Sequence, residues 1–394
     1  MKEHKKGTLL GGALLVAGTT IGGGMLALPV LTSPGGFIPS LALYAVCWLF
    51  MTFTGLLFLE LSLQMEDGVN IVSMAERTLG KGGKAVAWVL YLFLFYCLTI
   101  AYIEGCGDIL STLSQELIPR SVAPFIFLCI FAPFVYLGTR VVSRLNFYFM
   151  AALGVLYFSL IFLGLPEVKW QNLAARNWNL SLLALPIAFI AFAYQGIIPT
   201  LTTYLHHDKK KLTASIWLGT FTALTIYIIW QWVILGIIPF SGAGGLEEAL
   251  KKGQNAVYPL RNHLNIPHIY LLGQGFAFFA LLTSYFGVSL GLNDFLADGL
   301  KIKKTTVQGR LVLLALITIP PLTIALIYPD IFLKALDVAG GYGSALLLAL
   351  LPILMVAKWR QDHPESPRLV KGGMLVLGMM ALFVLFEIGI ELYK

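Results

Sequence analysis

The first apolar run of the chain is interrupted by Ala17-Gly18-Thr19-Thr20-Ile21-Gly22-Gly23-Gly24-Met25, and a later one by Ala193-Tyr194-Gln195-Gly196-Ile197-Ile198-Pro199. Glycine and proline weaken helical hydrogen bonding, and backbone buried in lipid has no water to replace the lost bonds. Irregular backbone at membrane depth persists only where it faces protein or a cavity. Two interruptions at matching places in two halves of a chain are the best sequence indicator of a transporter's substrate site.

The composition is that of a membrane protein. Of the 394 residues, 58% are hydrophobic and only 12% are charged, and the mean hydropathy is +0.82. Soluble domains are usually about 25% charged. The four cysteines lie within or beside apolar runs and show neither metal-ligand spacing nor a disulfide framework. The sequence therefore predicts an all-α polytopic membrane protein.

The apolar runs predict about eleven membrane-spanning helices, because a span needs roughly 20 mostly apolar residues. They cover residues 8–30, 38–63, 85–113, 122–137, 145–165, 182–205, 212–238, 269–300, 311–328, 331–357 and 372–390. Residues 69–79 are predicted to form a short amphipathic helix. The long loop 240–268 is predicted to contain a helix at 246–252 and to act either as a lid or as a plain connector.

Positive charge is distributed unevenly between the connections. Of the 27 lysines and arginines, 19 fall on one side of the predicted membrane: Lys2, Lys5, Lys6, Arg77, Lys81, Lys84, Arg140, Arg144, Lys209, Lys210, Lys211, Lys301, Lys303, Lys304, Arg310, Lys358, Arg360, Arg368 and Lys371. The other side has Arg120, Lys169, Arg176, Lys251, Lys252, Arg261, Lys334 and Lys394. Because cytoplasmic loops are enriched in basic residues, the N-terminus is predicted to be cytoplasmic and the C-terminus external. The same bias accounts for the net charge of +7, so no nucleic-acid partner is expected.

The two interrupted spans divide the chain into two units of five helices. Residues 8–165 would form repeat one, residues 182–357 repeat two, and residues 372–390 an extra helix, all within one transport domain over 1–394. Since five is odd, the second unit begins from the opposite side of the membrane. Both interrupted spans are then the first of their unit, as in a five-plus-five inverted repeat of the leucine-transporter type.

Two stretches resemble signatures of the hydroxy and aromatic amino acid permease family. They are Val16 to Pro29 (VAGTTIGGGMLALP) and Gly287 to Gly299 (GVSLGLNDFLADG). Within that family, Pro29 to Thr32, Gly35 to Phe37 and Tyr91 to Tyr96 are similar to the tyrosine-specific, chlamydial-type permeases. The resemblance implies a symporter of the bacterial inner membrane that imports L-tyrosine or another aromatic amino acid, with no cofactor and no enzymatic activity. Many bacterial members have His in the second interruption where this chain has Gln195.

A zwitterionic amino acid needs partners for a carboxylate and an ammonium. The half-helix that begins near Gly22–Gly24 offers free N–H groups and partial positive charge to the carboxylate. The half-helix that ends near Phe192–Tyr194 offers free carbonyls to the ammonium. The candidate substrate-binding residues are Thr19, Thr20, Gly22, Gly23, Gly24, Tyr96, Tyr102, Phe192, Tyr194, Gln195, Gly196 and Tyr285. The alternatives are close helix packing for the glycines, an interhelical hydrogen bond for Gln195, and core or lipid-facing positions for the aromatic residues.

The coupling ion remains open between H⁺ and Na⁺. Ionisable residues within spans are costly and mark function, which makes Glu60 and Glu104 the candidate proton carriers. The eighth helix also resembles that of sodium-coupled neurotransmitter-type symporters, which implies a sodium site of Gly18, Ile21, Ala280, Thr283 and Ser284. The alternative for the two hydroxyls is hydrogen bonding to their own helix. We favour protons because the permease signature covers more of the chain.

The sequence leaves three alternative functions. The first is a permease for a hydroxy or other neutral amino acid with sodium coupling. An intramembrane enzyme and a channel are more distant, because the sequence contains no His-Glu-x-x-His, no Gly-x-Ser-x-Gly and no repeated pore loop. The expected partners are an amino acid substrate and membrane lipid, while the exact amino acid and the oligomeric state stay open.

Overall fold

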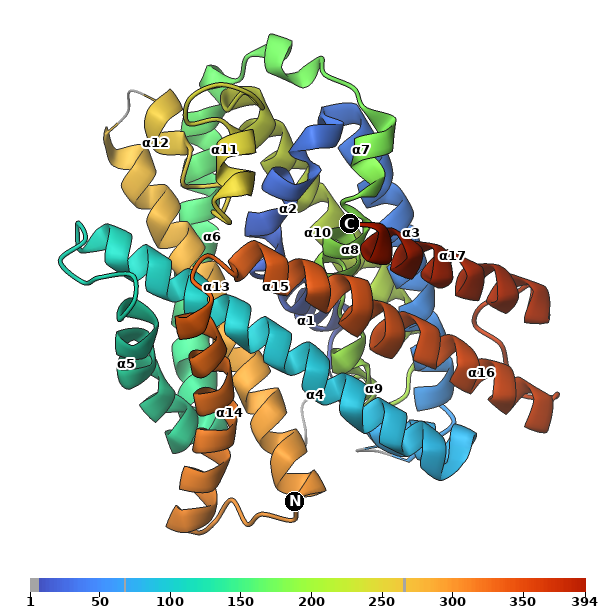
Figure 1. Ribbon diagram of the computed structural model, residues 1–394. Helices are drawn as coiled ribbons and strands as arrows, with labels where there is room; N and C mark the ends of the chain where they lie inside the picture. The colour runs from blue at the N-terminus through green and yellow to red at the C-terminus, as the bar shows by residue number, and fades with distance from the viewer. Residues whose placement is uncertain (1–6, 67–68, 265–266) are drawn as a thin grey trace.

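The computed structural model describes residues 7–66, 69–264 and 267–394, which form a bundle of helices (Figure 1). The chain is about 80% helical, and no residue in the described ranges lies in a β-strand. The prediction of an all-α polytopic protein is confirmed.

The long helices coincide with the eleven predicted runs. In the described part of the chain, nine helices are long and apolar enough to cross a membrane, a bent pair makes a tenth span, and one further apolar helix is shorter. The nine are α3 (Phe37–Ser62), α4 (Ile71–Leu113), α6 (Thr139–Gly164), α8 with α9 (Leu185–Tyr204), α10 (Lys209–Ile237), α13 (Pro267–Gly299), α14 (Val307–Ile327), α15 to α16 (Phe332–Asp362) and α17 (Gly373–Tyr393). The bent pair is α1 (Leu9–Thr20) with α2 (Gly24–Thr32), and the shorter helix is α5 (Ala123–Leu137).

The first predicted interruption is a real break between α1 and α2, and it bends the span by 55°. Helix α1 ends because Ile21 has an extended backbone, with φ −77° and ψ 106°. Helix α2 then starts from a bond of the Met25 N–H to the Gly22 carbonyl at 3.1 Å. The break leaves the carbonyl end of α1 and the amide end of α2 without partners in a continuous helix.

The second interruption divides another span into α8 (Leu185–Ala191) and α9 (Ile198–Tyr204), with a 3-10 turn over Gln195–Ile197 between them. Pro199 lies in the first turn of α9, where its missing N–H costs nothing. The first half ends at Ala191, slightly earlier than the predicted Phe192–Tyr194. Shorter helices precede α8: η2 (Leu165–Glu167), η3 (Trp170–Leu173) and α7 (Trp178–Leu182).

The two breaks lie against each other. A Cβ atom on Gly24 would be 3.2 Å from the Cα atom of Ala191, so α2 and α8 approach more closely than larger residues allow. Helix α10 lies behind both breaks, and the indole Nε1 of Trp230 donates to the Met25 carbonyl at 3.1 Å. The close approach of α2 to α8 and the hydrogen bond from α10 therefore hold the irregular backbone in place.

Two connecting segments contain helices that the sequence predicts. The segment labelled α4 consists of two helices that meet at Gly80, where the backbone is not helical (φ 75°, ψ −165°), so the short helix predicted at 69–79 is confirmed as the part before this break. Glycine adopts such positive φ values without steric cost. The long loop contains the predicted helix α11 (Leu246–Lys251) and a second one, α12 (Leu260–His263), while residues 265–266 lie outside the described ranges. The loop is tied to α2 by a bond from the Ala256 N–H to the Leu26 carbonyl at 3.0 Å.

Some of the basic residues that the sequence assigns to connections lie elsewhere or outside the described residues. Lys2, Lys5 and Lys6 lie outside the described residues. Arg360 was predicted to lie in a connection and instead lies inside α16, only 5% exposed, because a buried carboxylate pairs with it. The division into two inverted repeats stays a prediction.

Candidate functional site

A cavity of about 510 Å³ lies where the two breaks meet. That volume is typical of a site for a small ligand, roughly 300–1,000 Å³. Thirteen of the predicted residues line it: Gly18, Thr19, Thr20, Ile21, Gly22, Gly23, Gly24, Tyr102, Tyr194, Gln195, Gly196, Thr283 and Ser284. The two interruptions, far apart in sequence, therefore contribute to one site.

The cavity continues into a wider vestibule at one end of the bundle. The vestibule has a volume of about 1020 Å³ and shares six lining residues with the cavity: Asn70, Ile71, Tyr91, Gly196, Pro199 and Gly291. Its mouth carries charged residues, including Asp294 and Lys304, which form an ion pair at 2.9 Å. The site is thus open toward the end of the bundle that is predicted to be cytoplasmic.

Three predicted aromatic residues do not line the cavity. The Tyr96 hydroxyl donates to the Leu316 carbonyl of α14 at 3.0 Å. Tyr285 is fully buried elsewhere in the core, and its ring packs edge-on against a phenylalanine. Phe192 packs edge-on against Tyr227 of α10, with 5.2 Å between ring centroids.

The aromatic wall of the cavity comes instead from residues that sequence reasoning missed. Tyr91 and Phe95 of α4 line it together with Phe58 of α3, and the rings of Tyr91 and Phe95 stack at 4.0 Å. Tyr91, Phe95 and Tyr102 recur at helical spacing and so share one face of α4, whereas Tyr96 is turned about 100° away. That spacing was the signal that could have identified them. Asn146 of α6 also lines the cavity.

The glycines of the first break are surrounded closely. A Cβ atom on Gly22 would be 2.6 Å from Ser284 Oγ, and one on Gly23 would be 2.5 Å from the ring of Tyr102. The Gly23 N–H donates to Ser284 Oγ at 3.2 Å. Close helix packing and access of a ligand to the backbone therefore both require residues without a side chain in this segment.

Gln195 makes an interhelical connection. Its Oε1 accepts the Tyr194 N–H at 2.9 Å, and its Nε2 donates to Thr54 Oγ1 at 2.9 Å and to the Met51 carbonyl at 3.2 Å. The side chain is fully buried. It thus ties the second break to α3, in line with the structural alternative drawn from the sequence.

One tyrosine joins the carbonyl ends of both breaks. The Tyr227 hydroxyl lies 2.7 Å from the Thr20 carbonyl oxygen and 2.9 Å from that of Ala191. Thr20 is the last residue of α1 and Ala191 the last residue of α8. These are the groups at which each helix carries partial negative charge.

The residues of the sodium candidate are partly satisfied within the protein. Thr283 Oγ1 donates to the Phe279 carbonyl at 2.8 Å, and both Thr283 and Ser284 donate to the Ala280 carbonyl, at 3.2 and 2.8 Å. A hard cation prefers a cage of free oxygens. The Ala280 carbonyl accepts two hydroxyls and Ser284 Oγ accepts the Gly23 N–H, which leaves a lone pair on each hydroxyl oxygen. The sodium site stays a prediction.

Glu60 lies in a buried ion pair outside the cavity. Its carboxylate accepts two bonds from Arg360, at 2.7 and 2.8 Å, and one from the Leu369 N–H at 2.7 Å. Arg360 also donates to the Val370 carbonyl at 2.9 Å. The pair joins α3 to α16 and to the segment before α17, and every carboxylate oxygen has a partner.

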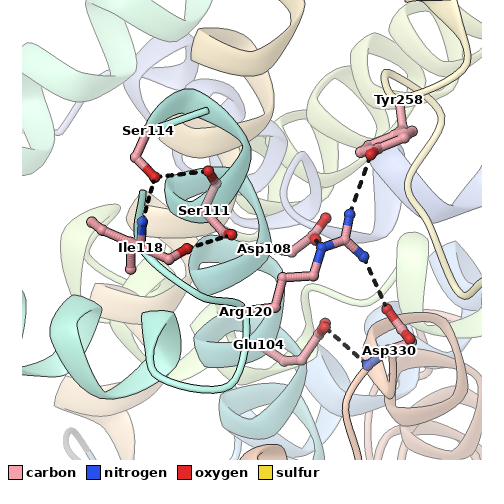
Figure 2. A network of polar contacts seen from close by, with 8 residues as sticks. All are labelled: Glu104, Asp108, Ser111, Ser114, Ile118, Arg120, Tyr258 and Asp330. Atoms are coloured by element: carbon pink, nitrogen blue, oxygen red, sulfur yellow. Dashed lines mark hydrogen bonds and ion pairs between the residues drawn. The ribbon is translucent and has the colours of Figure 1, made fainter. Parts of the chain in front are cut away.

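Glu104 belongs to a different network, away from the cavity lining (Figure 2). Its Oε1 accepts the Asp330 N–H at 3.2 Å, while its Oε2 is buried with no hydrogen-bond partner among the described residues. Figure 2 shows Arg120 between Asp108, Asp330 and Tyr258. The ion pairs measure 3.3 Å to Asp108 and 3.7 Å to Asp330.

The network contains three carboxylates and one guanidinium, and two of the carboxylates, Asp108 and Asp330, pair with it. Partial burial lowers the pKa of Arg120, but the charges of Asp108 and Asp330 and its contacts with Tyr258 outweigh this effect and raise it. Arg120 therefore stays charged, and the network has an excess of carboxylates. Burying an ionised carboxylate without a partner is costly, which makes Glu104 the group where a proton is most favourable.

Comparison with known proteins identifies the family. The family model described as the tryptophan/tyrosine permease family matches residues 5–391. The chain belongs to the tryptophan/tyrosine permease family. It is thus a transporter and not an enzyme.

Two relatives of this permease come from Haemophilus influenzae. The chain is 36% identical over 393 residues to tyrosine-specific transport system 1, covering 96% of each protein. It is 31% identical over 404 residues to a tryptophan-specific transport protein, covering 98% of this chain and 96% of the relative. The family and the apolar helices together make this permease a multi-pass inner-membrane protein that transports an amino acid.

The fold of the permease is similar to that of MhsT, solved in complex with L-phenylalanine. The TM-score is 0.69 at 16% identity, covering 96% of this chain and 98% of MhsT. At this identity the likeness concerns the fold alone, which is the leucine-transporter fold expected from the sequence.

Proposed function

We propose that this permease is a symporter that imports L-tyrosine or another aromatic amino acid and is driven by a proton gradient. The observation that carries the proposal is one cavity that unites both helix breaks with the aromatic face of α4. Helix ends supply groups for the two charges of an amino acid, and aromatic walls suit an aromatic side chain. The names of the two relatives are consistent with this substrate class.

The substrate is proposed to lie across the two breaks. Its carboxylate takes the amide end of α2 at Gly22–Gly24, where N–H groups point outward from the first turn. Its ammonium takes the carbonyl ends of α1 and α8, at Thr20 and Ala191. The aromatic side chain then lies along α4, and the vestibule provides the route to the cytoplasm.

We propose Glu104 rather than Glu60 as the proton carrier. Glu60 has partners for both oxygens and shares its charge with Arg360. Among the described residues, Glu104 Oε2 has no hydrogen-bond partner, and the side chain lies beside two other carboxylates. A carrier must change its charge during transport, and a group in a tight ion pair does so only at the cost of leaving its partner charge buried.

A panel of competitors tests the substrate class. L-tyrosine, L-tryptophan and L-phenylalanine should compete with labelled L-tyrosine for uptake, because each fills the aromatic part of the cavity. L-serine and L-glutamine should compete at least about tenfold more weakly, since they leave that apolar surface unburied. Equal competition by L-serine would instead favour the hydroxy or neutral amino acid reading.

Labelling of single cysteines tests the proposed orientation, with the N-terminus cytoplasmic and the C-terminus external. On a background with the four native cysteines replaced, Lys210→Cys and Tyr393→Cys are treated in intact cells with a membrane-impermeant maleimide. Both side chains are exposed at opposite predicted sides. We expect labelling of Tyr393→Cys alone, and labelling of Lys210→Cys alone would reverse the orientation.

A further inference from the structure

Tyr227 makes a contact that the sequence-based account did not assign. The residue lies on α10 and is only 1% exposed. Its hydroxyl is within hydrogen-bond distance of two backbone carbonyls, 2.7 Å from Thr20 and 2.9 Å from Ala191. Thr20 ends α1 and lines the cavity, while Ala191 ends α8 and is buried between the lining residues Ile190 and Ala193 of the same chain segment.

The Tyr227 hydroxyl cannot donate a full hydrogen bond to both the Thr20 and the Ala191 carbonyl. A phenol has a single proton and therefore donates fully to only one of two carbonyls at a time. The carbonyls at a helix C-terminus have no partner within the helix, and both helix ends direct partial negative charge toward the same point. Tyr227 thus holds the Thr20 and Ala191 carbonyl oxygens close together, and both oxygens can still accept further hydrogen bonds.

We infer that Tyr227 is a positioning residue for the substrate ammonium: its hydroxyl sets the spacing of the Thr20 and Ala191 carbonyls so that one ammonium engages both. This inference rests on the proposed function. A carbonyl oxygen has two lone pairs, so each can accept from Tyr227 and from the ammonium at once. The ammonium has three N–H donors and supplies the hydrogen bonds that the hydroxyl cannot.

The surroundings of Tyr227 fix its position. The ring of Phe192 packs edge-on against it at 5.2 Å, and Tyr44 in turn packs edge-on against Phe192 at 6.2 Å. This explains why Phe192 lies next to the second break without lining the cavity. It contacts the ring that carries the positioning hydroxyl.

The test compares two ligands in two matched variants. Tyr227→Phe removes one hydroxyl. Tyr157→Phe is the control, because the Tyr157 hydroxyl donates at 3.0 Å to the carbonyl of Ile226, which lies on the same helix as Tyr227 but whose bond is away from the breaks. Inhibition constants against labelled L-tyrosine are measured for unlabelled L-tyrosine and for 3-(4-hydroxyphenyl)propionate, which lacks the amine. Purified, monodisperse protein in liposomes is used for each variant.

We expect Tyr227→Phe to raise the inhibition constant of L-tyrosine about tenfold, the scale of one hydrogen bond to a charged group. The constant of the analogue should stay within about twofold, and Tyr157→Phe should change neither. An equal change for both ligands in Tyr227→Phe, or no change for either, would overturn the inference.

Two further results separate this inference from the proposed function. If the unaltered protein binds both ligands equally, the proposed ammonium site itself fails. If it prefers L-tyrosine and Tyr227→Phe keeps the full preference, only the role of Tyr227 fails. If Tyr227→Phe does not fold, Phe192→Leu replaces it, because this variant keeps the Tyr227 hydroxyl but removes the ring that packs against Tyr227. We then expect a smaller loss of affinity, confined to L-tyrosine. Equal losses of affinity for both ligands would contradict the inference.

Discussion

Gly22→Val should abolish uptake of L-tyrosine while the protein still reaches the membrane. Its Cβ atom would lie 2.6 Å from Ser284 Oγ, and its methyl groups would fill the part of the cavity offered to the carboxylate. Each hydrogen bond lost to a charged group costs roughly 1.5–3 kcal/mol, so affinity should fall at least about 10- to 150-fold. The measurements are initial uptake rate and membrane abundance.

Gly154→Val is the matched control for this substitution. Gly154 lies on α6, another membrane helix, and a Cβ atom there would meet no heavy atom of the described residues within 4 Å. We expect uptake close to that of the unaltered protein. Near-normal transport by Gly22→Val would exclude the first break from the substrate site.

Glu104→Gln should lose accumulation of substrate but keep exchange. Glutamine retains the Oε1 acceptor for the Asp330 N–H but cannot change its charge. A gradient of one pH unit supports about tenfold accumulation for one proton per substrate, so the accumulation ratio should fall from as much as about ten to about one. Both are measured in liposomes, with counterflow reporting exchange.

The control is Glu167→Gln, because Glu167 is an exposed carboxylate at the end of the short helix η2. It should keep both activities. Accumulation that survives Glu104→Gln would remove Glu104 as the carrier. If Glu104→Gln still accumulates substrate and Glu60→Gln does not, the role passes to Glu60.

The helix breaks could be predicted from the sequence because their causes are local. Glycine at Gly22–Gly24 and proline at Pro199 disturb helical bonding wherever they occur, and bilayer thickness fixes the length of the spans. These properties do not depend on which other helices lie nearby. They therefore placed ten of the candidate residues, those of the two breaks, on the cavity.

The residues that sequence reasoning missed depend on which face of a helix meets which neighbour. The rotation of α4 about its axis decides that Tyr91 lines the cavity while Tyr96 bonds to α14. Tyr227 lies 207 residues from Thr20 along the chain, and Glu60 lies 300 residues from Arg360. Such contacts arise from tertiary packing, and no local pattern indicates them.

Uptake into liposomes with one gradient imposed at a time tests the central claim most directly. Purified protein is reconstituted, labelled L-tyrosine is supplied outside, and either a pH gradient or a sodium gradient at equal pH is applied. We predict saturable accumulation with the inward proton gradient alone and none with the sodium gradient alone. Accumulation driven by sodium at equal pH, and absent with the pH gradient, would contradict proton-driven import of an aromatic amino acid.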